Sequence, residues 1–236
     1  MEQRRSVLKD WRRSSFGFFF EIPGAQVLTT GREFSLPAEE PAAPRLRSRL
    51  EEAGLRPRSV VGMRQVHGAR IEEIGPGPDR VMPDCDGLIT EQPGVALVIR
   101  TADCLPIAAV SENRVGVAHA GWRGVRAGIP GRLMERMGGA DLEVAIGPGI
   151  GPCCYEVGPE FDAWFPEHLV RREGRRFLDL AGAARAQMEA AGVAPDRIHA
   201  APWCTACSRE LLHSFRRDGA AAGRMLTVAM WVPGAA

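Results

Sequence analysis

The sequence predicts a mixed α/β (α+β) fold in which single strands and hairpins alternate with helices. Short apolar runs typical of strands recur along the chain, and helical patterns separate some of them without a regular strand–helix repeat. The chain has 236 residues, of which 45% are hydrophobic and 25% charged. A chain of this size and composition can bury a core without cross-links.

The individual elements follow from local patterns. A short amphipathic helix is expected in the segment 43–55, which ends at a glycine. Further helices are expected from Arg126 to Met137 and from Leu178 to Ala191, where Gly192 is a natural stop. The predicted strands are AQVLTT near Val27, SVVGMR near Val60, Val95–Ile99, Pro106–Val110, Arg114–Ala118, LEVAIG near Val144 and the final MLTVAMWV.

Charge and hydropathy exclude several classes of protein. The net charge is +1, which provides no general attraction to nucleic acid or membranes. No apolar run approaches the roughly 18–20 residues that cross a bilayer. The aromatic stretch near the amino terminus is interrupted by Glu21 and is shorter than the roughly 7–15 residues of a signal core. We therefore expect a cytoplasmic protein.

Three histidine or cysteine residues stand beside predicted strands. His67 follows one strand, Cys104 precedes a second, and His119 ends a third. The segment between Cys104 and His119 predicts a hairpin that turns around Glu112 and Asn113, and a hairpin brings its two ends together. We expect Cys104 and His119 to reach one point, where His67 joins them through tertiary folding.

Two imidazoles and one thiolate suit a borderline-soft divalent cation. Catalytic zinc typically has three protein ligands and an open fourth position, which favours zinc, and copper is the alternative metal. Two metal-free interpretations stay open. Cys104 is then a nucleophile with His119 as its base, or it is an inert buried side chain.

A series of motifs around these residues resembles a known family. In chain order they are QVHG, DGLIT, TADCLPI, AHAGWRG, IGPGIGPCCYEVG and FRRDG. Together they resemble the laccase-like family of the YfiH type, once called multicopper polyphenol oxidases and also called peptidoglycan editing factors. The resemblance extends from about Ser59 to Val232. We expect a single domain over residues 1–236, with residues 1–58 as a divergent N-terminal segment.

The resemblance implies a fold, a metal centre and an activity. The family fold packs β-sheets between helices, and its metal ligands, which form the catalytic centre, correspond to His67, Cys104 and His119. Its members are described largely as purine nucleoside phosphorylases with adenosine deaminase and methylthioadenosine phosphorylase activities. The resemblance therefore implies a zinc enzyme, with copper as the alternative, that acts on adenosine, inosine and guanosine with phosphate. We expect a monomer or small homo-oligomer without nucleic-acid or membrane partners.

Other functions stay open at this point. One is a peptidoglycan-precursor editing hydrolase, and another is a copper-dependent polyphenol oxidase, although five histidines are fewer than a multicopper oxidase normally needs. A third is a metal- or redox-binding protein without enzymatic activity. The signature of zinc nucleobase deaminases is absent, because no histidine is followed two places later by glutamate.

Three further side chains are candidates for substrate binding. Arg123 follows His119 by four residues, and its guanidinium suits a phosphate or nucleoside oxygen. Gln65 would share a face with His67 if the preceding strand continued. Asp103 adjoins Cys104 and either orients a ligand histidine or caps a turn.

The sequence departs from the family pattern in two places. In the segment TTGREFSLPAEEPAAP, only Gly31, Arg32 and the pair Ser35 and Leu36 resemble the family's early motifs. Ala206 stands where the family has an aromatic residue between two cysteines. We expect the first departure to change the substrate contacts made by that region, and Ala206 to change packing or a base-stacking surface.

The remaining cysteines are expected to pack without a ligand. Cys153 and Cys154 are adjacent, which makes them poor joint ligands for one metal ion. Cys204 and Cys207 form a Cys-x-x-Cys pair, which would need two further ligands to hold zinc and a low-pKa thiol to act in redox chemistry.

Overall fold

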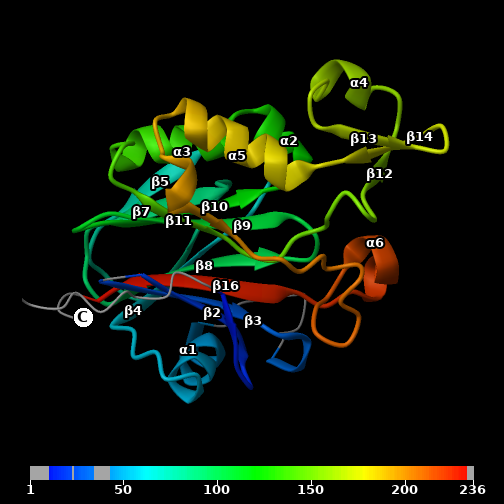
Figure 1. Cartoon of the computed structure of the whole chain (residues 1–236). Helices are drawn as coiled ribbons and strands as arrows, with labels where there is room; N and C mark the ends of the chain where they lie inside the picture. Colours follow the sequence, from blue (N-terminus) through cyan, green and yellow to red (C-terminus); the bar gives the residue numbers. More distant parts are fainter. Residues whose placement is uncertain (1–10, 23, 35–42, 233–236) are drawn as a thin grey trace, which may run out of the picture.

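Two large sheets lie face to face between helices in the computed structural model of the chain (Figure 1). The structure describes residues 11–22, 24–34 and 43–232. The outer face of one sheet is covered by α2 (Trp122–Arg126), α3 (Ile129–Met137) and α5 (Leu180–Ala190), and α1 (Ala43–Glu52) lies against the outer face of the other. The predicted mixed α/β class, with sheets packed between helices, is confirmed.

The first sheet has seven strands and contains both ends of the described chain. In spatial order the strands are β1 (Arg12–Arg13), β2 (Gly17–Ile22), β3 (Ala25–Thr30), β16 (Met225–Trp231), β8 (Val95–Thr101), β4 (Ser59–Met63) and β6 (Arg80–Met82). The central strand β16 pairs antiparallel with β3 on one side and with β8 on the other.

The second sheet has six strands and is built around the hairpin of β9 (Leu105–Val110) and β10 (Val115–Ala120). The turn of this hairpin is closed by a hydrogen bond from the Ser111 N–H to the Arg114 carbonyl oxygen, at 3.0 Å. In spatial order the strands are β15 (Ile198–Ala200), β11 (Glu143–Ile146), β9 (Leu105–Val110), β10 (Val115–Ala120), β7 (Gly87–Thr90) and β5 (Ile71–Ile74).

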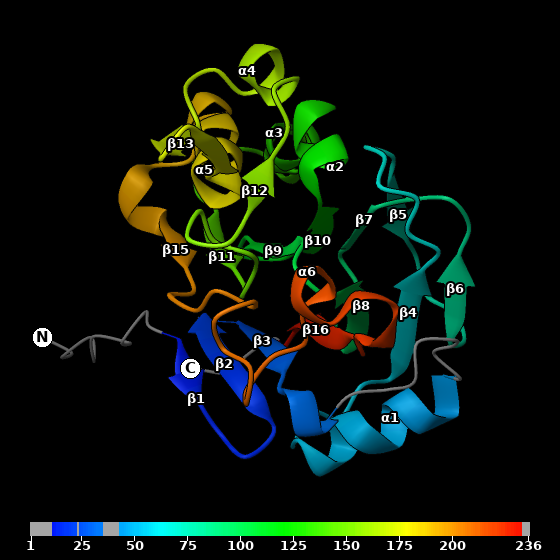
Figure 2. The same cartoon turned by 90° about the vertical axis from the view of Figure 1, so that its right-hand side faces the viewer.

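A small third sheet lies at the end of the molecule that faces the viewer in Figure 2, on the same side as α6 (Phe215–Asp218). Its strands, in spatial order, are β12 (Glu156–Val157), β14 (Arg175–Leu178) and β13 (Leu169–Arg172). The helices are α1 (Ala43–Glu52), α2 (Trp122–Arg126), α3 (Ile129–Met137), α4 (Phe161–Trp164), α5 (Leu180–Ala190) and α6 (Phe215–Asp218), with short 3₁₀ turns η1 (Arg32–Phe34), η2 (Pro195–Arg197) and η3 (Gly219–Ala221).

Strand alternation sorts the apolar side chains into separate cores. In β8, Leu97 and Ile99 pack between the two sheets, whereas Ala96 and Val98 belong to the core that includes the leucines of α1. The same alternation in β10 places Val117 between the sheets. Because side chains alternate along a strand, one apolar run supplies two cores at once.

Most of the predicted elements are present, and their ends differ for local reasons. The expected helix from Arg126 is divided, because Gly128 adopts a φ of 83° and separates α2 from α3. The expected helix from Leu178 begins at Leu180, since the Asp179 side chain accepts the N–H of Gly182 as an N-cap. The aromatic stretch weighed as an export signal forms β2 of the first sheet.

No helix among the described residues is both long and apolar enough to cross a membrane. Of the possible family remnants in the early segment, Ser35 and Leu36 lie outside the described residues.

Candidate metal centre

The three predicted ligands meet where the two sheets join. His67 lies in the loop after β4 of the first sheet, and His119 is the penultimate residue of β10 in the second. Cys104 lies in the connection 102–104, which passes from β8 in the first sheet to β9 in the second. His119 pairs with Pro106 in the β9–β10 hairpin, so the hairpin brings Cys104 and His119 together.

The donor atoms of these side chains are close enough to share one ion. They lie within 4.8 Å of one another, and the two imidazole ring centroids are 4.7 Å apart at an interplanar angle of 77°. A tetrahedral zinc ion with bonds of about 2.0–2.3 Å would hold its ligand atoms about 3.3–3.8 Å apart. The donor set therefore fits a borderline-soft divalent ion with one coordination position left open.

One carboxylate positions two of the three candidate ligands. Asp86 is fully buried, and its Oδ1 lies 2.7 Å from Nδ1 of His119. The same carboxylate accepts the backbone N–H groups of Val66, His67 and Gly68 at 3.2, 2.9 and 2.7 Å. It thus directs Nε2 of His119 toward the centre and fixes the loop in which His67 has a φ of 61°.

Asp86 is a functional residue that the sequence reasoning missed. It belongs to the DGLIT motif, which contributed to the family resemblance without a role for its aspartate. A carboxylate directly before a fully buried strand was the available signal, because a buried charge requires several hydrogen-bond partners.

Neighbouring groups favour the thiolate of Cys104, which binds a metal, and the protonated form of His119, which must lose its proton to do so. Burial opposes ionisation of Cys104, but hydrogen bonds and charges from His119 and His67 lower the pKa of its thiol to about 6. Burial disfavours the imidazolium of His119, whereas Asp86 and Cys104 raise its pKa to about 9. The thiolate is the metal-binding form of cysteine, and a metal ion would displace the proton of His119.

Gly121 is required for the three ligands to approach one another. A Cβ atom at this position would lie 2.8 Å from Sγ of Cys104 and 3.1 Å from Cδ2 of His67. Both distances are below ordinary van der Waals contact, so a larger residue would displace the candidate ligands. This close approach explains the glycine that follows the strand of His119.

The three ligands open into a cavity of about 540 Å³ with a cationic wall. Burial and the charge of Arg224 lower the pKa of Arg100, which shows that two guanidinium groups of this wall repel each other. A bound anion would relieve this repulsion. The arginines that line the cavity are Arg64, Arg100, Arg216 and Arg224.

Two aromatic residues complete the cavity. Phe215 lines it and is 54% exposed, which is unusual for a phenylalanine. Tyr155 also lines the cavity, and burial together with the Cys104 charge raises the pKa of its phenol above the ordinary value. The cavity therefore combines cations, an exposed ring and a neutral hydroxyl beside the candidate metal site.

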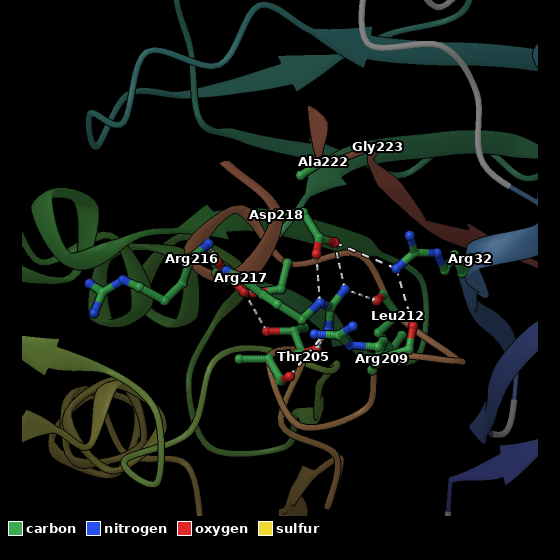
Figure 3. A network of polar contacts seen from close by, with 12 residues as sticks. Arg32, Thr205, Arg209, Leu212, Arg216, Arg217, Asp218, Ala222 and Gly223 are labelled. Carbon is green, nitrogen blue, oxygen red and sulfur yellow. Dashed lines mark hydrogen bonds and ion pairs between the residues drawn. The ribbon is translucent and has the colours of Figure 1, made fainter. Parts of the chain in front are cut away.

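The two arginines of the FRRDG motif have different surroundings (Figure 3). The guanidinium of Arg217 forms an ion pair with Asp218 at 2.7 Å and donates to the carbonyl oxygens of Thr205 and Leu212, each at 2.9 Å. Arg217 therefore holds the loop that leads into α6. Arg216 points away from this network, and its guanidinium carbon lies 5.1 Å from the centroid of the Tyr155 ring.

Arg32 also belongs to this network. Its Nη1 lies 3.5 Å from Oδ2 of Asp218 and donates to the carbonyl oxygen of Arg209 at 3.1 Å. In this structure the possible family remnant Arg32 ties η1 to the C-terminal loop (Figure 3).

Two of the three candidate substrate residues line the cavity but use their side chains on the protein. Gln65 donates to the carbonyl oxygen and accepts the N–H of Arg100, both at 2.8 Å. Because β4 ends at Met63, the predicted strand alternation does not extend to Gln65. Asp103 accepts the Thr205 hydroxyl and the Arg216 N–H, both at 2.6 Å. Asp86, and not Asp103, orients His119.

Arg123 lies apart from the lining of the cavity. Its guanidinium carbon stands 4.4 Å from the centroid of the Trp122 ring, and the residue is exposed. The positive charge of Arg123 lowers the pKa of the Tyr155 phenol, but burial raises that pKa by more.

Fold and site together define a mixed α/β protein with a Cys-His-His candidate metal centre at the junction of two sheets. The chain belongs to the family described as multi-copper polyphenol oxidoreductase laccase, which matches residues 39–232.

Named relatives and a solved structure support this membership. The purine nucleoside phosphorylase YlmD of Geobacillus stearothermophilus is 42% identical over 187 residues, which make up 69% of this chain and 68% of that protein. The adenosine deaminase RL5 of an unknown prokaryotic organism is 33% identical over 192 residues, or 71% of this chain and 73% of that protein. The crystal structure of YlmD from Geobacillus stearothermophilus has a TM-score of 0.83 at 31% identity, covering 95% of this chain and 99% of that chain.

Proposed function

We propose that the protein is a zinc-dependent purine nucleoside phosphorylase acting on adenosine, inosine and guanosine, with adenosine deaminase and methylthioadenosine phosphorylase as side activities. The observation that carries this proposal is the three-donor cluster that opens into a cavity lined by arginines. The names of the two relatives support the same substrate class. We place the activity in the cytoplasm, in a monomer or small homo-oligomer.

His67, Cys104 and His119 would hold the metal ion, and their spacing fits this role. A bound zinc ion polarises a substrate oxygen or lowers the pKa of water. Asp86 keeps the His119 ring in one orientation, so that a single imidazole nitrogen is presented to the centre. Copper is the alternative metal for the same three donors.

Phosphate would bind the cationic wall of the cavity. Arg100 and Arg224 repel each other there, and a phosphate placed between them would gain charge-assisted hydrogen bonds from both. In phosphorolysis a phosphate oxygen forms a bond to the ribose C1′ while the bond from C1′ to the purine nitrogen breaks. The base leaves with the electron pair of that bond, and the arginines hold the attacking phosphate in place.

The purine base would stack on Phe215. Its exposed ring lines the cavity beside the cationic wall, and base–aromatic stacking contributes about 1–3 kcal/mol per base. Tyr155 keeps its proton because burial raises its pKa, so its hydroxyl is available as a hydrogen-bond donor to the substrate.

We propose a different kind of substrate role for each of Gln65, Asp103 and Arg123. Gln65 lines the cavity and would contact the substrate with the part of its amide that Arg100 leaves free. Asp103 would act through the backbone of Arg216, whose position it fixes. Arg123 would act through its long-range charge on Tyr155.

Product analysis tests the proposal directly. The purified protein is incubated with inosine and with adenosine, each with and without phosphate, and the products are separated by chromatography. We expect phosphate-dependent release of hypoxanthine and adenine, together with a smaller conversion of adenosine to inosine. The Cys104→Ala variant loses these products. The Cys85→Ala variant is a matched control, because Cys85 is buried outside the metal centre.

The alternatives give different outcomes in the same preparation. No product from any nucleoside, with metal still bound, would contradict the proposal. Release of an amino acid from a peptidoglycan precursor would then indicate an editing hydrolase. Oxidation of a polyphenol that depends on added copper would indicate the oxidase function.

A further inference from the structure

Four cysteines outside the proposed catalytic centre come together at one point. Their sulfur atoms all lie within 4.8 Å of one another, and Sγ of Cys207 lies 3.5 Å from that of Cys153 and 3.4 Å from that of Cys154. The remaining member is Cys204. All four are free thiols in the structure. They come from two loops that are about fifty residues apart in the sequence.

The chain geometry explains how the adjacent pair contributes two sulfur atoms. Cys153 and Cys154 lie in a turn in which the N–H groups of Cys154 and Tyr155 donate to the carbonyl oxygen of Gly151, each at 3.0 Å. Neighbouring side chains point to opposite faces in a strand, but not in a tight turn. The objection that adjacent cysteines make poor joint ligands therefore does not apply here.

The second loop presents Cys204 in the way that a thiolate requires. The Gly151 N–H donates to its Sγ at 3.2 Å. An N–H group aimed at a sulfur atom stabilises negative charge on it. Gly149 and Cys204 form a parallel β-bridge that holds the two loops together.

A cation stands beside the first loop. Nη2 of Arg172 donates to the carbonyl oxygens of Pro152 and Cys153, at 2.7 and 3.3 Å. A divalent ion with four thiolates carries a net negative charge, which a nearby guanidinium stabilises. The arginine also fixes the turn that contains the cysteine pair.

We propose that Cys153, Cys154, Cys204 and Cys207 bind a second zinc ion as a closed four-thiolate structural site. Four thiolates are the ligand set of structural zinc, and a tetrahedral ion with Zn–S bonds of about 2.3 Å holds its sulfur atoms about 3.8 Å apart. The distances from Sγ of Cys207 to those of Cys153 and Cys154 lie slightly below this value, and all four sulfur atoms lie within 4.8 Å of one another. With every coordination position filled by protein, the ion binds no substrate.

The site would fix one wall of the catalytic cavity. Tyr155 directly follows the cysteine pair, and Arg216 lies in α6, which follows the loop of Cys207. Arg217 ties α6 to the backbone of Thr205 and Ala206, between the two cysteines of the second loop (Figure 3). A metal link between the loops would therefore add to the contacts by which Arg217 and the β-bridge already hold this wall of the cavity.

Metal analysis of the purified, reduced protein tests the proposal. We expect two zinc ions per chain in the wild type, one in Cys104→Ala, one in Cys207→Ser and none in the double variant. The Cys85→Ala control keeps both ions, because Cys85 is buried outside both clusters. A wild type that binds one zinc ion, all of which is lost in Cys104→Ala, would overturn the proposal.

A second measurement avoids dependence on folding of the Cys207 variant. The Cys104→Ala protein, which retains all four cluster cysteines, is stripped of metal and refilled with cobalt(II). We expect the intense sulfur-to-cobalt charge-transfer bands of a tetrahedral four-thiolate site at one equivalent of metal. The absence of these bands, or an intact mass that shows cysteine pairs oxidised to disulfides in a preparation without metal, would overturn the assignment. The Cys207→His variant keeps one zinc ion in this background, because a Cys₃His set also binds zinc.

Discussion

The two thiol-containing clusters of this protein differ in whether they would leave a coordination position of a bound metal ion open. His67, Cys104 and His119 supply three donors beside a cavity of about 540 Å³, so a metal ion there would keep a position for a substrate. The four-cysteine cluster supplies four donors and would fill every position of a tetrahedral ion. The number of donors, more than their chemical type, separates a proposed reactive centre from a proposed structural one.

The groups that hold the two clusters in place also differ. The buried carboxylate of Asp86 sets the orientation of His119 and the loop of His67. The four-cysteine cluster is supported by the backbone N–H of Gly151, which donates to Cys204, and by the guanidinium of Arg172. A side chain that tunes one ligand suits a reactive site, whereas backbone groups that fix a loop suit a structural one.

The largest expected effect is a difference in nucleoside turnover between variants of the two clusters. Cys104→Ala removes the thiolate of the proposed reactive centre, and we expect nucleoside turnover to fall by more than ~100-fold, the upper end of what an outer-shell change costs. Cys207→Ser removes a ligand of the other cluster, and its specific activity per folded protein stays within a few-fold of wild type. Steady-state rates on both variants check this difference. Equal losses in the two would remove the distinction.

A smaller effect is expected at the carboxylate that supports the reactive centre. In Asp86→Asn the amide cannot accept all four N–H groups that the carboxylate accepts, and the His119 ring loses its charged partner. We expect zinc affinity at this centre to fall about 10–100-fold. Competition with a chromophoric chelator in the Cys207→Ser background measures this affinity without the second site. An unchanged affinity would show that Asp86 is only a core residue.

The exposed ring beside the reactive centre gives a test of specificity. Phe215→Ala removes the proposed stacking surface, and we expect KM for inosine to rise about 5-fold, equivalent to about 1 kcal/mol, with kcat little changed. Phe215→Tyr keeps an aromatic ring and serves as the matched control, with KM near that of wild type. A change in kcat without a rise in KM, or an equal rise in KM in both variants, would contradict stacking on the ring.

The smallest expected effect concerns stability in acid. Burial raises the pKa of Asp86, but hydrogen bonds from His119 and Gly68 outweigh it and leave the pKa below its usual value. A group whose folded pKa is lowered stabilises the protein above its unfolded pKa, near 3.9, and this stabilisation is lost as pH falls through the folded pKa.

Urea unfolding of the chelated protein measures this contribution. As the pH falls below about 4, the free energy of unfolding should decrease more in the wild type than in Asp86→Asn, which lacks the titrating group. Parallel pH profiles for the two proteins would assign the acid sensitivity to other carboxylates.

The sequence predicts those parts of the site that depend on neighbouring segments. The hairpin around Glu112 and Asn113 places Cys104 beside His119, and its turn and apolar runs are visible in the sequence. The final strand is predicted by its apolar run, although its central place between β3 and β8 is not. Local patterns indicate elements but not which distant strands pair.

The parts that could not be predicted depend on contacts between distant loops. Asp86 reaches His119 across thirty-three positions, and Cys207 reaches Cys153 across fifty-four. The cavity arginines Arg100, near the end of β8, and Arg224, directly before β16, are brought together by the pairing of these two strands. The adjacency of Cys153 and Cys154 argued against shared ligation until the turn that contains them was known.

The connection that carries Cys104 links the chemistry of the protein to the thickness of its core. Only residues 102–104 pass from β8 in one sheet to β9 in the other. Ala108 and Ala145 are among the small side chains buried between these sheets. Larger side chains there would push the layers apart and draw the short connection, with its thiol, away from the histidines. An engineer who thickens this inter-sheet core to gain heat resistance would therefore retune the metal centre, so stability and catalysis cannot be optimised independently in this fold.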